Sequence, residues 1–214
     1  MLCFNYSDYQ TNWKKAFRKA PFRLQFIVTF GLLTVLLFSL SYFFAYVEAR
    51  TGHRVNDVIL NLTAPIDLSL ATFLLIYGAA IICIISLLNK PQLFLKAIQA
   101  YFFILLFRML TLYLFPLEAP DGIILLKDPV IEHFFYGQVR ITKDLFFSGH
   151  VATVCLLYLA NPIKKLNLFY LGVFILVALF IMIQRVHYSF DVLAAPVFAW
   201  TSWKLANKTA QTKN

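Results

Sequence analysis

The sequence predicts an all-α, polytopic membrane protein, folded as a bundle of six transmembrane helices with both termini in the cytoplasm. Three observations support this prediction. The 214 residues are 61% hydrophobic and only 14% charged, with a mean hydropathy of +0.74, whereas soluble domains average about 45–50% apolar and roughly 25% charged residues. Six apolar stretches approach or reach membrane length, and Lys and Arg gather on one side of them.

Each predicted span is close to the roughly 17–25 residues that cross a bilayer as a helix. The stretches are 24–47, 68–88, 92–115, 146–160, 167–184 and 189–206. The fourth is the shortest, and hydropathy supports it least. Together they predict one transmembrane catalytic domain over 24–206, with a basic interfacial segment at 1–23 and a cytoplasmic tail at 207–214. Residues 116–145 hold three prolines and two glycines, which predicts a long outer loop.

The distribution of basic residues sets the predicted orientation, because cytoplasmic segments carry an excess of Lys and Arg. With the N-terminus inside, the cytoplasmic segments hold twelve Lys and Arg against one acid, Asp8. The outer segments hold six Lys and Arg and nine acids, while Arg108 lies within a span. The net charge of +9 then follows from topology and from anionic lipids at the inner leaflet, so we expect no nucleic-acid partner.

The cysteines predict neither a disulfide nor a metal site. Cys3, Cys83 and Cys155 are scattered without metal-ligand spacing, and nothing in their pattern indicates a redox pair. We therefore expect no metal and no cofactor. The sequence leaves the oligomeric state open.

Two short polar motifs precede predicted spans. Residues 144–150 read Asp-Leu-Phe-Phe-Ser-Gly-His and open the fourth span, and residues 185–191 read Arg-Val-His-Tyr-Ser-Phe-Asp and open the sixth. In the predicted topology both motifs lie at the non-cytoplasmic face, at the depth of Arg108 near the outer end of the third span. Placing histidine or aspartate near hydrocarbon costs free energy, so we expect these residues to have a functional role.

The residues of these motifs suit phosphoryl transfer. Ser148 and Gly149 lie at a predicted helix N-terminus, where unpaired N–H groups and a partial positive charge bind phosphate. His187 and Asp191 are four residues apart and would share one helix face. The carboxylate can then fix the imidazole tautomer and leave the other nitrogen as a base or nucleophile. His150 could protonate a leaving oxygen.

Arg108 and Arg185 are candidate phosphate ligands, because a guanidinium group binds two phosphate oxygens at once. Placing arginine at the centre of a span costs about 2.5–3.5 kcal/mol on insertion scales, so we expect Arg108 in particular to have a functional role. Glu118, just beyond the third span, is a candidate accessory base. Structural alternatives stay open: Ser148 as a simple N-cap, the histidine–aspartate pair as an interfacial ion pair, Arg185 as a headgroup contact and Glu118 as a turn residue.

Three blocks within residues 100–206 resemble the type-2 phosphatidic acid phosphatase superfamily, closest to its sphingomyelin synthase-like branch. They are Arg108-Met-Leu-Thr111 with the turn Pro116-Leu-Glu-Ala-Pro120, then residues 144–150, then His187-Tyr-Ser-Phe-Asp191. The chain departs from the phosphatases in two places. Their Lys-x6-Arg-Pro block is missing from the outer loop, and Ile181 stands where their Arg-x5-His arginine would be. These departures favour the synthase-like branch.

The resemblance implies a six-helix membrane fold and metal-independent chemistry. It makes His187 the nucleophile of a phosphohistidine intermediate, oriented by Asp191, with His150 assisting the departing alcohol. Arg108 would match the arginine of that branch, and we infer that Arg185 replaces the missing one. We therefore expect a lipid phosphatase or headgroup phosphotransferase acting on a membrane lipid, with water and a lipid hydroxyl both open as acceptors. The alternatives are a non-catalytic lipid-binding or scramblase-like protein with a degenerate site, and a small transporter.

Overall fold

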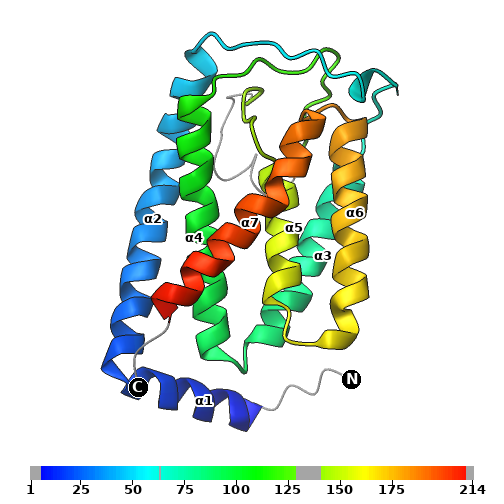
Figure 1. Cartoon of the computed structure of the whole chain (residues 1–214). Helices are drawn as coiled ribbons and strands as arrows, with labels where there is room; N and C mark the ends of the chain where they lie inside the picture. The colour runs from blue at the N-terminus through cyan, green and yellow to red at the C-terminus, as the bar shows by residue number, and fades with distance from the viewer. Residues whose placement is uncertain (1–5, 63, 129–140, 211–214) are drawn as a thin grey trace.

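The computed structural model describes residues 6–62, 64–128 and 141–210, and within these ranges it contains seven α-helices, two 3-10 helices and no strand (Figure 1). The elements in chain order are α1 (Tyr6–Arg18), α2 (Ala20–Ala49), η1 (Leu60–Leu62), α3 (Ser69–Leu87), α4 (Pro91–Leu114), α5 (Gly149–Ala160), η3 (Lys164–Leu166), α6 (Asn167–Ile183) and α7 (Ser189–Ala210). The all-helical prediction is confirmed. Residues 129–140 of the predicted outer loop and 211–214 of the predicted tail lie outside the described residues.

Four helices in the described chain are long and apolar enough to cross a membrane. They are α2, α3, α4 and the unit that η3 and α6 form together, Lys164–Ile183. These helices indicate a membrane protein. The predicted fourth and sixth spans differ from them: α5 is an apolar helix of only 12 residues, and α7 carries Lys204 and Lys208 in its last two turns.

The short helix α5 occupies the middle of the bundle. It packs against α3, α4, α6 and α7, and the largest apolar cluster of the protein includes its inward residues. Val151, Ala152 and Val154 have no exposed surface, because their small side chains let the four neighbouring helices approach closely. A helix enclosed by protein does not have to match the thickness of the bilayer, which accounts for the short predicted stretch at 146–160.

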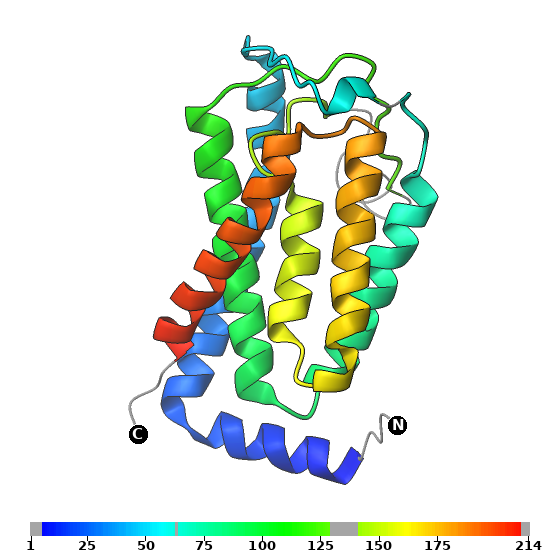
Figure 2. The same cartoon turned by 45° about the vertical axis from the view of Figure 1, so that its right-hand side comes forward.

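Helix α1 lies across one end of the bundle at a steep angle to the other helices, as both views show (Figures 1 and 2). The indole N–H of Trp13 donates to the carbonyl of Leu88 at 2.6 Å and fastens α1 to the turn between α3 and α4. The predicted basic segment at 1–23 is thus mainly a helix. The first long helix, α2, begins four residues earlier than the predicted span at 24–47.

The loop segments 50–62, 64–68, 115–128 and 141–148 and the turn at 184–188 lie at the opposite end of the bundle (Figure 1). Gln184 is fully buried there, and its side-chain amide donates to the Ser69 hydroxyl at 2.9 Å and accepts from the Leu68 amide at 3.0 Å. Lys143 donates to the carbonyl of Arg50 at 2.6 Å. These contacts give the loops a defined arrangement around the N-terminal ends of α5 and α7.

Candidate functional site

The two polar motifs meet where α5 and α7 begin. Ser148 is the N-cap of α5, and its hydroxyl accepts from the amide of Val151 at 3.4 Å. The amide of Ser148 donates to the carbonyl of Asp191 at 3.1 Å. Ser148 and Asp191 both have no exposed surface. A backbone hydrogen bond therefore joins the motif of residues 144–150 to that of residues 185–191.

His187 and Asp191 form a buried pair. The imidazole Nδ1 lies 3.2 Å from Asp191 Oδ2, and only 1% of His187 is exposed. His187 lies in the turn before α7 rather than on the helix, so the contact does not arise from the shared helix face that the sequence predicted. Instead Asp191, in the first turn of α7, reaches back and also accepts the amide of Tyr188 at 3.2 Å, as the acid of a capping box does.

Asp57, in the loop after α2, caps α7 from outside the helix. One carboxylate oxygen accepts the amide of Ser189 at 2.6 Å, and the other accepts the amide of Ile59 at 3.0 Å. Burial favours a higher pKa for Asp57, but the hydrogen bonds from Ser189, Leu60 and Ile59 outweigh it and lower the pKa. Asp57 is therefore a charged cap of α7. It fixes the residue at which the helix begins, Ser189, which follows Tyr188.

His150, the second residue of α5, has an imidazole with free hydrogen-bonding capacity. Its Nδ1 is buried and has no hydrogen-bond partner among the described residues. The ring lies edge-on to Phe73 with centroids 5.7 Å apart. A buried imidazole nitrogen without a partner is costly, and a bound substrate group would supply the missing contact.

Arg108 of α4 lies against the first residue of α5. Its guanidinium donates from Nη1 to the carbonyl of Phe147 at 3.2 Å, and Nη2 forms an ion pair with Asp144. A Cβ atom on Gly149 would lie 2.0 Å from Nη1 of Arg108, so the glycine is what lets the arginine approach the helix. Only 8% of Arg108 is exposed. The arginine thus adds a positive charge beside the N-terminus of α5.

Arg185 and Glu118 lie in the network of outer loops. Arg185 has a left-handed backbone, φ 56°, and its Nη1 donates to the carbonyl of Asp121 at 2.9 Å. The Glu118 carboxylate accepts the Gly52 amide at 2.8 Å and pairs with Lys143 at 3.0 Å. These two contacts, the Gly52 amide first, lower the pKa of Glu118. A carboxylate with a lowered pKa is a weak base, so the contacts favour the structural alternative for Glu118.

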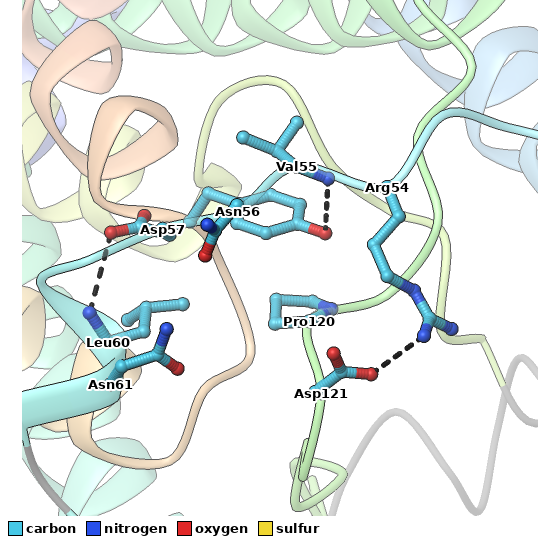
Figure 3. A pocket seen from close by; sticks show the side chains of 9 residues that line it. Arg54, Val55, Asn56, Asp57, Leu60, Asn61, Pro120 and Asp121 are labelled. Carbon is cyan, nitrogen blue, oxygen red and sulfur yellow. Dashed lines mark hydrogen bonds and ion pairs between the residues drawn. The ribbon is translucent and has the colours of Figure 1, made fainter.

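A pocket of about 340 Å³ opens among the outer loops (Figure 3). Its lining includes Asp57, Tyr188 and the ion pair of Arg54 with Asp121, which are 2.8 Å apart. The phenol of Tyr188 accepts from the Val55 amide at 3.3 Å. Neither His150 nor His187 is among the residues that line it. The pocket adjoins the turn that carries His187 without containing the imidazole.

Sequence reasoning missed two acids of this site. Asp144 was part of a recognised motif but had no role until the structure paired it with Arg108. Asp57 had no signal in its local sequence, because its partner Ser189 is 132 residues away. Among the described residues, no group of three His, Cys, Asp or Glu side chains could hold a metal ion.

Comparisons with protein-family models, with curated proteins and with solved structures found no match to this chain. The family resemblance therefore rests on the sequence motifs alone.

Proposed function

We propose that this chain is a six-span membrane enzyme that cleaves or transfers a phosphorus-linked lipid headgroup through a phosphohistidine on His187. In this proposal α5 and α7 complete the six spans, both termini are cytoplasmic and the site faces the other side. The observation that carries the proposal is the buried pair of His187 and Asp191, joined by a backbone hydrogen bond to the N-terminus of α5. The sphingomyelin synthase-like motifs of the sequence support the same chemistry.

The proposed site lies below the outer end of the bundle. In both views α5 begins below the upper ends of α4 and α6 (Figures 1 and 2). Its 12 residues extend only roughly 18 Å at about 1.5 Å per residue, whereas the hydrocarbon core of a bilayer is about 30 Å thick. With the inner end of α5 at the inner interface, the histidines lie on the order of 10 Å below the outer one. The phosphates of outer-leaflet lipids lie in the headgroup region outside the hydrocarbon core, so the substrate has to bring its phosphate inward to reach the histidines.

The first half-reaction uses the two histidines in opposite roles. Asp191 accepts a hydrogen bond from the Nδ1–H of His187, which leaves the lone pair on Nε2 for attack on phosphorus. A phosphorus–nitrogen bond forms while the bond to the leaving alcohol oxygen breaks. His150 in its protonated form gives that oxygen its proton. The first N–H groups of α5 and the guanidinium of Arg108 bind the phosphoryl oxygens, and the phosphate competes with Asp144 for Arg108.

The second half-reaction restores the enzyme. His150, now neutral, takes the proton from the acceptor hydroxyl while the acceptor oxygen attacks phosphorus. The phosphorus–nitrogen bond breaks, and its electron pair returns to Nε2 of His187. Water as acceptor gives a phosphatase, and the hydroxyl of ceramide or diacylglycerol gives a headgroup transferase. Exclusion of water from the site decides between them.

The decisive experiment is turnover of labelled lipids by the purified protein in liposomes with EDTA present. The panel contains phosphatidic acid, a lipid pyrophosphate, phosphatidylethanolamine and phosphatidylcholine, each with and without ceramide or diacylglycerol. We expect turnover that resists EDTA and is lost in His187→Ala, together with an acid-labile phosphoryl label on the wild-type protein. His53→Ala is the matched control, because His53 is an exposed loop histidine.

The outcome that overturns the enzyme proposal is equally specific. If His187→Ala and His150→Ala both fold and leave every lipid-dependent activity unchanged, the chain is a non-catalytic lipid-binding or scramblase-like protein. Transbilayer movement of a fluorescent lipid in the same liposomes would then distinguish a scramblase from a binding protein.

A further inference from the structure

Two lysines and two tryptophans lie near one another at the end of the bundle opposite the histidine pair. The Lys96 ammonium, on α4, lies 3.7 Å from the ring centroid of Trp203 on α7. The Lys204 ammonium lies 5.2 Å from the ring centroid of Trp200. Trp203 and Lys204 are consecutive residues of α7, so the contact of Lys96 with Trp203 brings the two lysines to the same level of the bundle. These cation–π contacts fix both lysines in place on neighbouring helices.

This pair of lysines has no acidic partner in the described part of the chain. The ion pairs found there join other residues, and neither Lys96 nor Lys204 takes part in one. Two like charges held near each other without a counter-charge are unfavourable, and a bound anion would remove the repulsion. The arrangement is therefore complementary to a single negatively charged group.

An exposed apolar strip on α7 leads to the lysines. Leu193, Val197 and Trp200 are 73%, 62% and 54% exposed, and Lys204, also exposed, follows them. The spacings of four, three and four residues place all four side chains on one face of the helix. The strip has the length and character to contact an acyl chain, and the lysine stands where the chain would end in a headgroup.

We propose that Lys96 and Lys204 bind the phosphate of an anionic phospholipid in the cytoplasmic leaflet, with an acyl chain along the exposed strip of α7. Lys96 lies five residues after the start of α4, which is about 7.5 Å along the helix axis. With the start of α4 at the membrane surface, this distance places Lys96 at the boundary between the headgroups and the hydrocarbon core. Tryptophans concentrate at that level of membrane proteins. A zwitterionic lipid fits less well, because its own ammonium would add a third positive charge. The site depends on the proposed orientation of the chain and not on the proposed reaction.

The test measures binding of dioleoylphosphatidylglycerol to the full chain in neutral detergent, with dioleoylphosphatidylcholine as the zwitterionic probe. Native mass spectrometry counts bound lipid, and the shift of the thermal midpoint with added lipid gives the affinity. We expect phosphatidylglycerol to bind preferentially, and K96Q/K204Q to weaken it about fivefold per lysine, which corresponds to about 1 kcal/mol each. K96R/K204R keeps the charges and should retain most of the affinity.

The control variant is K164Q/K165Q, which removes two exposed lysines from η3 at the same end of the bundle. We expect it to weaken phosphatidylglycerol binding less than twofold. Equal losses in K96Q/K204Q and K164Q/K165Q would show unspecific attraction to basic charge and overturn the site, as would no loss in either. K204Q alone guards against misfolding, because Lys204 is exposed, and it should lose about fivefold. Lipid turnover plays no part in this measurement, so the two proposals fail separately.

Discussion

Gly149→Ala tests the close approach of Arg108 to α5. The added Cβ would lie 2.0 Å from Nη1 and 2.4 Å from Cζ of Arg108, far inside van der Waals contact. The arginine side chain has to move, and it then loses its hydrogen bond to Phe147 and its ion pair with Asp144.

The magnitude follows from those two contacts. Hydrogen bonds to charged groups contribute about 1.5–3 kcal/mol each, so the loss of both costs roughly 3–6 kcal/mol. Alanine recovers up to about 1 kcal/mol as the better helix former. We expect the free energy of unfolding to fall by about 2–5 kcal/mol, and lipid turnover to fall with it because the arginine leaves the proposed phosphate site.

The assay is equilibrium unfolding in mixed micelles, with Gly172→Ala as the matched control. Gly172 lies in α6 and nothing stands within 4 Å of an added Cβ, so that variant should be neutral or slightly stabilised. The sharper test is a double-mutant cycle: in an Arg108→Ala background the clash is gone, and Gly149→Ala should cost almost nothing. If Gly149→Ala is as stable as Gly172→Ala, the reasoning about Arg108 is wrong.

Three further predictions concern the acids around the site. Asp191→Asn should lower lipid turnover on the order of 10³-fold or more, because the amide cannot stabilise the positive charge on His187; a loss below tenfold would contradict the assigned role. Asp57→Ala should reduce the free energy of unfolding by about 1–2 kcal/mol, because α7 loses its cap, and an unchanged denaturation midpoint would refute this. The pKa of Glu118 is lowered in the folded chain, so its contribution to stability is present at neutral pH and is lost as the pH falls through that lowered pKa. Thermal midpoints between pH 7 and pH 3 should therefore decline more steeply in wild type than in Glu118→Gln, and parallel curves would disprove the contribution.

Hydropathy was enough to predict the apolar helices, whereas α1 was expected only as a basic interfacial segment. The stretches 68–88 and 167–184 match α3 and α6 to within one residue at each end, because the polar residues around each apolar run mark where the run ends. The start of α2 was placed too late, at residue 24 rather than 20. The first turn of α2 carries Arg23, and its charge places residues 20–23 in the predicted basic segment rather than in the span.

The motifs also predicted residues that the structure brings together, though not how they are held. The pairing of His187 with Asp191 was expected from their spacing, yet the contact forms across the start of α7 and not along a helix face. Glu118 was a candidate base until its contacts with Gly52 and Lys143 were known. Both outcomes depend on backbone conformation that a spacing rule does not contain.

The sequence by itself determined the helical class, the apolar stretches and the identity of the polar motifs, because these depend on composition and on neighbours a few residues away. Only the tertiary structure decided that Arg108 is held by Asp144 against Gly149, and that Asp57 caps α7. The physical reason is that those contacts join residues 36 and 132 positions apart. Helix packing, rather than any local preference of the chain, brings such residues together.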